Sequence, residues 1–288
     1  MVRNFGGILG NGFAQAFSVM LYCEQRPQIS GAALLEALRR RCGRVEPLDS
    51  ADDSHLLAYE YLDHAVEFDD QTLPVSSLTT ILDSIRDSQR VIDALNQTWD
   101  WPEAREALSH CHAMVGIHDV MAYGLDYKER LALFHNIVLS VLDLVPCLAI
   151  DWLSSQQIVS PQAYVESKQP DNAPGYVLLY PALNVRFFNI KERIKGEKLM
   201  DTLGLNAFGL PDLQCHYVGL EPGEVALMLY NAAYYIYDQG DVVEDGQTIQ
   251  GVGPQDKWIC RHDKALAAPE REVLDIDPGL EYTRGIRD

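Results

Sequence analysis

The sequence lacks the short motifs that identify many enzymes. It has no G-x-S-x-G nucleophile motif, no H-E-x-x-H zinc motif and no phosphate-binding loop, because the glycine-rich residues 6–12 precede a strand and carry no lysine. Cysteine and histidine are adjacent at Cys111–His112 and Cys215–His216. Neighbours on a strand point to opposite faces, so neither pair forms a nucleophile with its base. We therefore predict a protein that is not an enzyme, with no catalytic residue, no metal and no cofactor.

Cysteines and long apolar runs are also scarce. The six cysteines are scattered singly, without a C-x-x-C pair, which is typical of reduced, buried thiols in a cytosolic protein. A disulfide framework is the alternative. No apolar run approaches the roughly 18 residues of a membrane span. We expect a cytoplasmic protein that does not enter a membrane.

Basic residues are also few compared with acidic ones. The chain has 23 Lys and Arg against 42 Asp and Glu, a net charge of −19. Such a chain repels nucleic acids and anionic lipids and attracts basic surfaces. Its 47% hydrophobic and 9% aromatic content indicates a packed protein instead of a disordered one. We therefore expect a basic protein as partner, and neither a nucleic acid nor a membrane.

The acids are concentrated in two windows that contain no Lys or Arg. Residues 45–85 hold ten acids, and residues 199–256 hold nine. The windows indicate a binding face for a basic partner. The alternatives are surface charge that serves only solubility, and a calcium site, although the EF-hand spacing is missing. The candidate contact residues of the first window are Asp49, Asp52, Asp53, Asp63, Glu67, Asp69 and Asp70, and those of the second are Asp241, Glu244 and Asp245.

Histidines and tyrosines offer weaker signals. His110, His112 and the pair His118–Asp119 lie on one expected strand and could hold zinc, or could simply line a polar strand face. Four tyrosines between residues 230 and 237 cover more than one face of an expected helix, so some must reach the surface. Surface tyrosines beside acids suit a protein interface, and they also suit a homodimer.

The hydrophobic pattern predicts an α+β fold. We expect a strand over 18–23, a helix over 30–43, two strands within 55–70, a helix over 78–95 and a strand over 110–120. That order, β-α-β-β-α-β, is the ferredoxin-like arrangement. A helix capped at Asp126 and another over 225–240 belong to a second half with a similar order of elements. We predict two pseudo-related halves, residues 1–125 and 126–288, with antiparallel sheets and packed helices.

Two resemblances complete the sequence evidence. The stretches G-L-P-D (209–212), D-G-Q-T (245–248) and P-E-R-E-V-L (269–274) resemble a bacterial domain-of-unknown-function family, number 4261, over about residues 200–279. That family carries no known chemistry. The whole chain also resembles immunity proteins encoded beside type VI secretion toxins, in particular partners of nuclease toxins of the restriction-endonuclease-like class. This resemblance implies binding and neutralisation of a basic nuclease toxin in the cytoplasm. An adaptor or chaperone for a secreted effector, and an uncharacterised hydrolase, are the alternatives.

Overall fold

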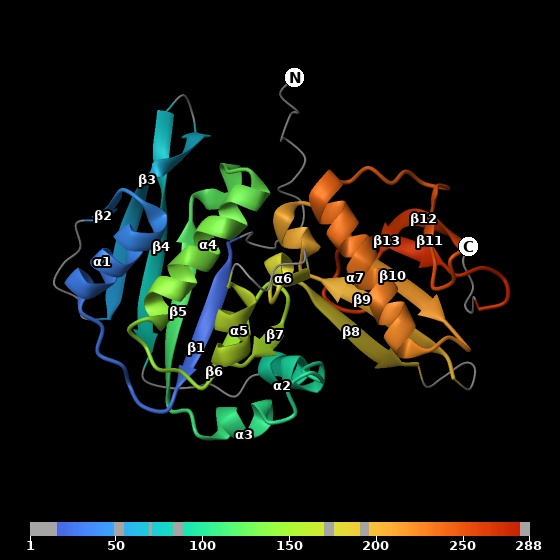
Figure 1. The fold of residues 1–288 in the computed structure, drawn as a ribbon, viewed down its shortest axis with the longest axis horizontal. Helices are drawn as coiled ribbons and strands as arrows, with labels where there is room; N and C mark the ends of the chain where they lie inside the picture. The colour runs from blue at the N-terminus through green and yellow to red at the C-terminus, as the bar shows by residue number, and fades with distance from the viewer. Residues whose placement is uncertain are drawn as a thin grey trace. The chain divides into compact units, whose positions relative to one another are not determined.

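The computed structural model describes residues 16–48, 55–68, 71–82, 89–169, 176–190 and 196–282 (Figure 1). These residues form two compact units that divide between residues 184 and 185. We call residues 16–184 the N-terminal unit and the described residues from 185 onward the C-terminal unit. None of the helices in the described ranges combines the length and apolar character needed to span a bilayer.

The N-terminal unit is built on a seven-stranded sheet in the order β2-β3-β4-β5-β1-β6-β7. Every pairing between neighbouring strands is antiparallel. β1 lies inside the sheet, and its alternate residues Val19, Leu21 and Cys23 are fully buried. The strands are β1 (Ser18–Cys23), β2 (Val45–Pro47), β3 (Leu56–Phe68), β4 (Gln71–Leu82), β5 (Ala113–Val120), β6 (Ala149–Trp152) and β7 (Gln157–Val159).

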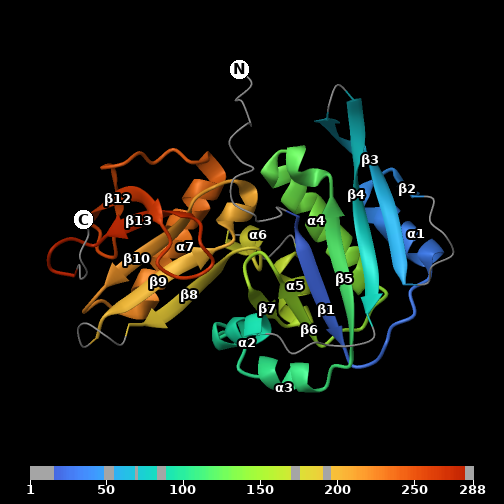
Figure 2. The same ribbon diagram turned by 180° about the vertical axis from the view of Figure 1, so that it is seen from behind.

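Helices α1 (Gly31–Cys42) and α4 (Tyr127–Leu142) lie against each other on one face of this sheet (Figures 1 and 2). Ser30 caps α1 by accepting a hydrogen bond from the Ala33 N–H, and Asp126 caps α4 in the same way. Three arginines occupy the last turn of α1, where the helix dipole favours cations. The sequence therefore contains the signals that begin and end both helices.

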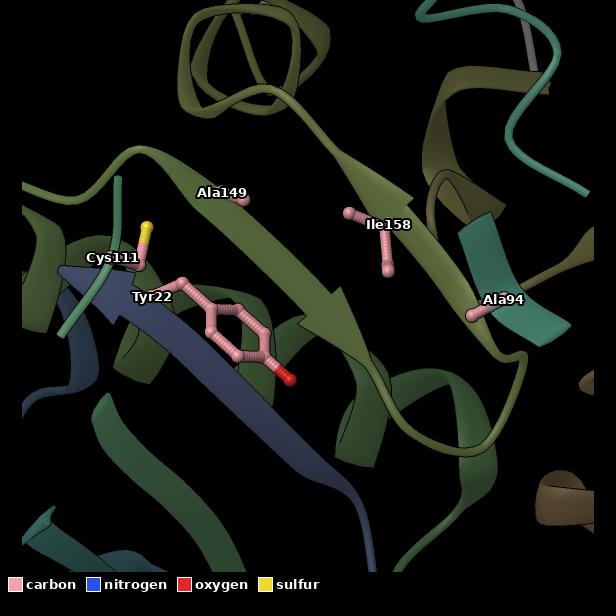
Figure 3. Packing of buried hydrophobic residues seen from close by; sticks show 5 residues of the cluster. All are labelled: Tyr22, Ala94, Cys111, Ala149 and Ile158. Carbon is pink, nitrogen blue, oxygen red and sulfur yellow. The ribbon is translucent and has the colours of Figure 1, made fainter. Parts of the chain in front are cut away.

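The opposite face of the sheet packs against α2 (Gln89–Asn96) and the residues around α3 (Ala104–Ser109). Figure 3 shows the centre of this packing, where Tyr22, Ala94, Cys111, Ala149 and Ile158 converge from five segments of the chain. The remaining short elements of this unit are η2 (Ala122–Gly124), α5 (Pro161–Ser167) and α6 (Tyr176–Leu179). All six cysteines of the chain are free, and all but the half-buried Cys147 are buried.

The C-terminal unit is a six-stranded sheet in the order β11-β12-β13-β10-β9-β8. β10 pairs in parallel with β13 and antiparallel with β9. Helix α7 (Pro222–Gln239) packs on β9 and β10, begins with a proline in its first turn and ends at Gly240, whose φ is 85°. The other elements are β8 (Asn184–Asn189), β9 (Lys198–Leu203), η4 (Leu205–Phe208), β10 (Asp212–Tyr217), β11 (Thr248–Gln250), β12 (Lys257–Lys264) and β13 (Glu272–Asp277).

The α+β class is confirmed, but the ferredoxin-like arrangement is wrong for the N-terminal unit. In that arrangement the first strand of the motif lies between the third and the fourth, whereas here β5 lies between β1 and β4. The boundary expected at residue 125 lies inside the N-terminal unit, because α4 packs on α1 and β6 pairs with β1. A relation between the two halves of the chain stays a prediction.

Two local predictions are also corrected. Of the helix expected over 78–95, residues 78–82 belong instead to strand β4, residues 83–88 lie outside the described residues, and helix α2 covers the part from Gln89 onward. The two strands expected within 55–70 are the single strand β3, whose pairing with β4 shifts register between Tyr61 and Ala65. The shift is a bulge, which bends a strand without ending it.

Candidate protein-binding surface

The three acids predicted for the second patch lie together. Asp241, Glu244 and Asp245 are all exposed in the turn between α7 and β11. His262 on β12 reaches this turn: its Nδ1 lies 2.8 Å from the Asp245 carboxylate, and its Nε2 lies 3.2 Å from that of Asp241. The backbone N–H of His262 also donates to Asp245, over 2.7 Å. We call these four residues the His262 cluster; its contacts fix the acidic turn against the sheet.

Contacts within the cluster shift the pKa values of Asp245 and His262. Hydrogen bonds from the backbone N–H and the imidazole of His262 lower the pKa of Asp245. Partial burial opposes protonation of His262, but the hydrogen bonds and negative charges of Asp245 and Asp241 outweigh it, and the pKa of His262 is raised. The carboxylate of Asp245 is thus held in its charged form, with a titratable imidazole beside it.

The cluster continues a longer run of exposed carboxylates. This run follows α7 and the turn after it, and no Lys or Arg occurs anywhere between residues 199 and 256. Its exposed acids are Glu221, Glu224, Asp238, Asp241, Glu244 and Asp245.

The first predicted patch is described only in part. Asp49, Asp52, Asp53, Asp69 and Asp70 lie outside the described residues. Asp63 and Glu67 are exposed on β3, and each has a polar partner. The Glu67 carboxylate accepts a hydrogen bond from the Thr72 hydroxyl over 2.7 Å.

Asp63 is an ion-pair partner of Arg44. Its carboxylate accepts hydrogen bonds from the Arg44 backbone N–H over 2.8 Å and from the guanidinium over 2.6 Å. These two contacts lower the pKa of Asp63. Arg44 lies just outside the cation-free window, so charge counting along the sequence did not reveal this pairing.

Two acids of the second window are not on the surface at all. Asp201 and Asp212 are fully buried in a network with two buried arginines. Arg186 binds both oxygens of Asp201, over 2.9 and 2.6 Å, and Arg271 bridges Asp201 and Asp212, over 2.7 and 3.0 Å. Thr202 and the backbone N–H of Leu205 complete the shell of Asp212. These acids stabilise the sheet and are unavailable to a partner.

The histidines do not form a zinc site. His118 contacts the Ser18 hydroxyl over 2.8 Å, and Asp119 forms a buried ion pair with Arg130. His110 and His112 are exposed. Within the part of the chain that the structure describes, no group of three or more potential ligands is arranged to hold a metal ion.

One further polar cluster lies inside the N-terminal unit. Burial lowers the pKa of Lys168 to about 7, although its ammonium lies 3.1 Å from His135 Nε2 and contacts the backbone carbonyl of Tyr180. His135 Nδ1 lies 2.8 Å from the Tyr164 hydroxyl. These contacts tie α4, α5 and the segment after α6 together, and we assign them to stability. No pattern in the sequence pointed to this cluster.

The tyrosines of α7 divide between core and surface, as their spacing predicts. Tyr237 is buried, Tyr230 and Tyr234 are half-buried, and Tyr235 is 50% exposed. Their distribution brings an aromatic side chain to the outer face of the helix that leads into the His262 cluster.

The comparisons with known proteins identify one region. Residues 201–277 match a family model described as Domain of unknown function (DUF4261). The match begins at Asp201 and ends with β13, and therefore includes α7, the His262 cluster and three members of the buried charge network. No curated protein and no solved structure matches the chain.

Proposed function

We propose that the protein is an immunity protein that binds a basic nuclease toxin and neutralises it in the cytoplasm. The observation that carries the proposal is the run of six exposed carboxylates between residues 221 and 245, in a window without Lys or Arg. Self-repulsion in such a surface costs stability, and a binding role explains why the charge is kept together.

Electrostatics accounts for how such a surface would act. A nuclease presents a basic cleft to its phosphate substrate. A complementary acidic surface is steered to that cleft and reaches it faster than a neutral protein would. An interface of about 1,600 Å² with a few buried anchors suffices for tight binding. In this proposal the protein acts by occupying the cleft and has no catalytic activity of its own.

The first experiment expresses the product of the adjacent gene in a test host, with and without this protein. Intact host DNA and co-purification of the two proteins support immunity. If the neighbour is bound but its nuclease activity persists, the protein is an adaptor or chaperone instead. If the two proteins do not bind, the immunity proposal is rejected.

A charge-neutralising variant then tests the surface. Asp241→Asn, Glu244→Gln and Asp245→Asn together should lower the association rate and reduce its dependence on salt. The matched control neutralises three exposed acids elsewhere, Glu36, Glu166 and Glu270, with the same change in net charge. Equal effects of the two variants would show that only the total charge matters and would remove the His262 cluster from the interface.

A further inference from the structure

The outer face of α7 carries a stripe of exposed residues with helical spacing. Its five members are Glu224, Leu227, Asn231, Tyr235 and Asp238, separated by three or four positions, so all lie on one side of the helix. Leu227 is 57% exposed and Tyr235 is 50% exposed. We call these five residues the α7 stripe.

The fold does not require these two apolar side chains. Helix α7 lies on the sheet of the C-terminal unit (Figures 1 and 2). The opposite side of the helix packs through Val225, Leu229, Ala233 and Ile236, all of which are buried. Replacement of Leu227 by a polar residue would leave that packing untouched. Val242, which follows the helix, is exposed as well, at 47%. Apolar exposure is therefore repeated along the segment that also carries the acidic run.

We propose that the α7 stripe is a docking surface for a basic protein, with Leu227 and Tyr235 as its apolar anchors. This inference rests on the proposed function and names the part of the surface that would supply most of the binding energy. Aromatic and aliphatic anchors surrounded by polar residues are the usual composition of an interface centre. The acids at the two ends of the stripe, Glu224 and Asp238, select a partner whose apolar contact is bordered by Lys and Arg.

Charge argues against a second copy of this chain as the occupant. In a twofold symmetric dimer the same patch meets itself, so carboxylates would face carboxylates. The stripe lies in a window with no Lys or Arg to relieve that repulsion. A cationic partner removes the repulsion and gains attraction.

The anchors and the acids have separable kinetic effects. Charges outside the centre of an interface act mainly on the association rate and its salt dependence, whereas buried anchors act mainly on the dissociation rate. Loss of the anchors should therefore speed dissociation and leave the salt dependence of association unchanged. Neutralisation of the acids should slow association and weaken its salt dependence, and should leave the dissociation rate unchanged.

The test measures binding of the full-length protein to the product of the adjacent gene by surface plasmon resonance. Leu227→Ala with Tyr235→Ala should raise the dissociation rate at least about tenfold. The matched control is Leu266→Ala with Tyr123→Ala, which removes a leucine and a tyrosine that are 62% and 58% exposed. The control should change the dissociation rate less than about twofold. Unchanged melting temperatures show that both variants fold.

Three results would overturn the proposal, and they differ from one another. If the wild-type protein does not bind the neighbour, the proposed function fails and the docking surface fails with it. If it binds and the two anchor substitutions have no more effect than the control, only the docking surface is rejected. If sedimentation shows a wild-type dimer that these substitutions dissociate, the stripe binds a second copy instead.

Discussion

The carboxylate of Asp201 accepts hydrogen bonds from two arginines and is fully buried, while that of Asp241 lies exposed beside one histidine. Both residues belong to the same acid-rich window. A buried charge without its partner is costly, whereas an exposed charge is stabilised by water. At the scale of single residues, the surroundings thus decide whether an acid holds the fold together or faces a partner.

Arg271 is the residue on which the buried network depends most. We expect Arg271→Met to lower the free energy of unfolding by about 3–5 kcal/mol, because Asp212 would lose its only buried guanidinium among the described residues. Urea denaturation measures the change. Lys264→Met is the control, since Lys264 and its partner Glu270 are both more than two-thirds exposed, and should cost less than about 1 kcal/mol. A similar small loss for Arg271→Met would refute the structural role of the network.

His262 makes part of the stability depend on pH. Its pKa is raised in the folded state, so its contribution is fully present below the unfolded pKa of about 6.5 and is lost as pH rises through the folded value. Wild type should therefore exceed His262→Gln in stability more at pH of about 5.5 than at about 8.5. Denaturation at the two pH values gives the difference. The exposed His112, outside the cluster, supplies the control substitution His112→Gln.

The sequence placed Asp241, Glu244 and Asp245 in an acidic window, but it did not show that Asp201 and Asp212 of the same window are buried. Arg186 and Arg271 are 15 and 70 positions from Asp201, and both lie outside the acidic window. Only the fold brings them together. The partner of Asp241 and Asp245, His262, is likewise distant along the chain and had no motif to identify it.

At the scale of elements, β4 shows why a helical spacing was misleading. Its most deeply buried positions alternate through Val75, Ser77, Thr79 and Ile81, as a strand requires. Two of the four are hydroxyl residues, so the alternation is hidden in a plot of hydrophobicity. Ser77 is accommodated because its hydroxyl lies 2.7 Å from that of Tyr61 on the neighbouring strand. By contrast, α1, α4 and α7 were predictable, since caps, prolines and glycines begin and end them.

The end of α1 offers a test of local backbone geometry. Gly43 has a φ of 81°, and a Cβ at this position would collide with the Asp63 carboxylate. Gly43→Ala should cost more than about 1 kcal/mol, from strain and from the displaced Arg44–Asp63 pair. Gly246 has a φ of 85° and open space around it. Gly246→Ala therefore measures the cost of backbone strain without a collision.

The collision can be separated from strain by a double substitution. In an Asp63→Ala background, the cost of Gly43→Ala should fall to that of Gly246→Ala. Thermal and urea unfolding of the four variants provide the comparison. An undiminished cost in that background would show that Asp63 does not restrict Gly43.

At the scale of the whole molecule, a net charge of −19 acts against folding. The effect is visible in the sheet, where Glu46 on β2 pairs directly opposite Glu60 on β3. Like charges in that position are destabilising. Exposed ion pairs such as Arg41–Asp143, whose atoms approach to 2.5 Å, oppose the effect but are fewer than the acids require.

Salt should therefore stabilise the protein. We expect the free energy of unfolding at pH 7 to rise between about 20 and about 300 mM NaCl, as screening reduces the repulsion among acids more than it weakens surface ion pairs. Urea titrations at several salt concentrations measure the trend. A fall with added salt would mean that attractive pairs dominate and that the exposed acids are more fully compensated than the described contacts show.

The position of β13 has a consequence for the order in which the C-terminal unit forms. This strand is the last one described, yet it lies between β10 and β12 in the sheet (Figure 1). During synthesis, the piece β8-β9-β10 and the hairpin β11-β12 leave the ribosome before the strand that joins them. The edge of β10, whose residues are all buried in the finished sheet, stays open until residue 277 has emerged. For that interval the nascent chain offers an uncovered strand edge, a species prone to misassociate until β13 is inserted.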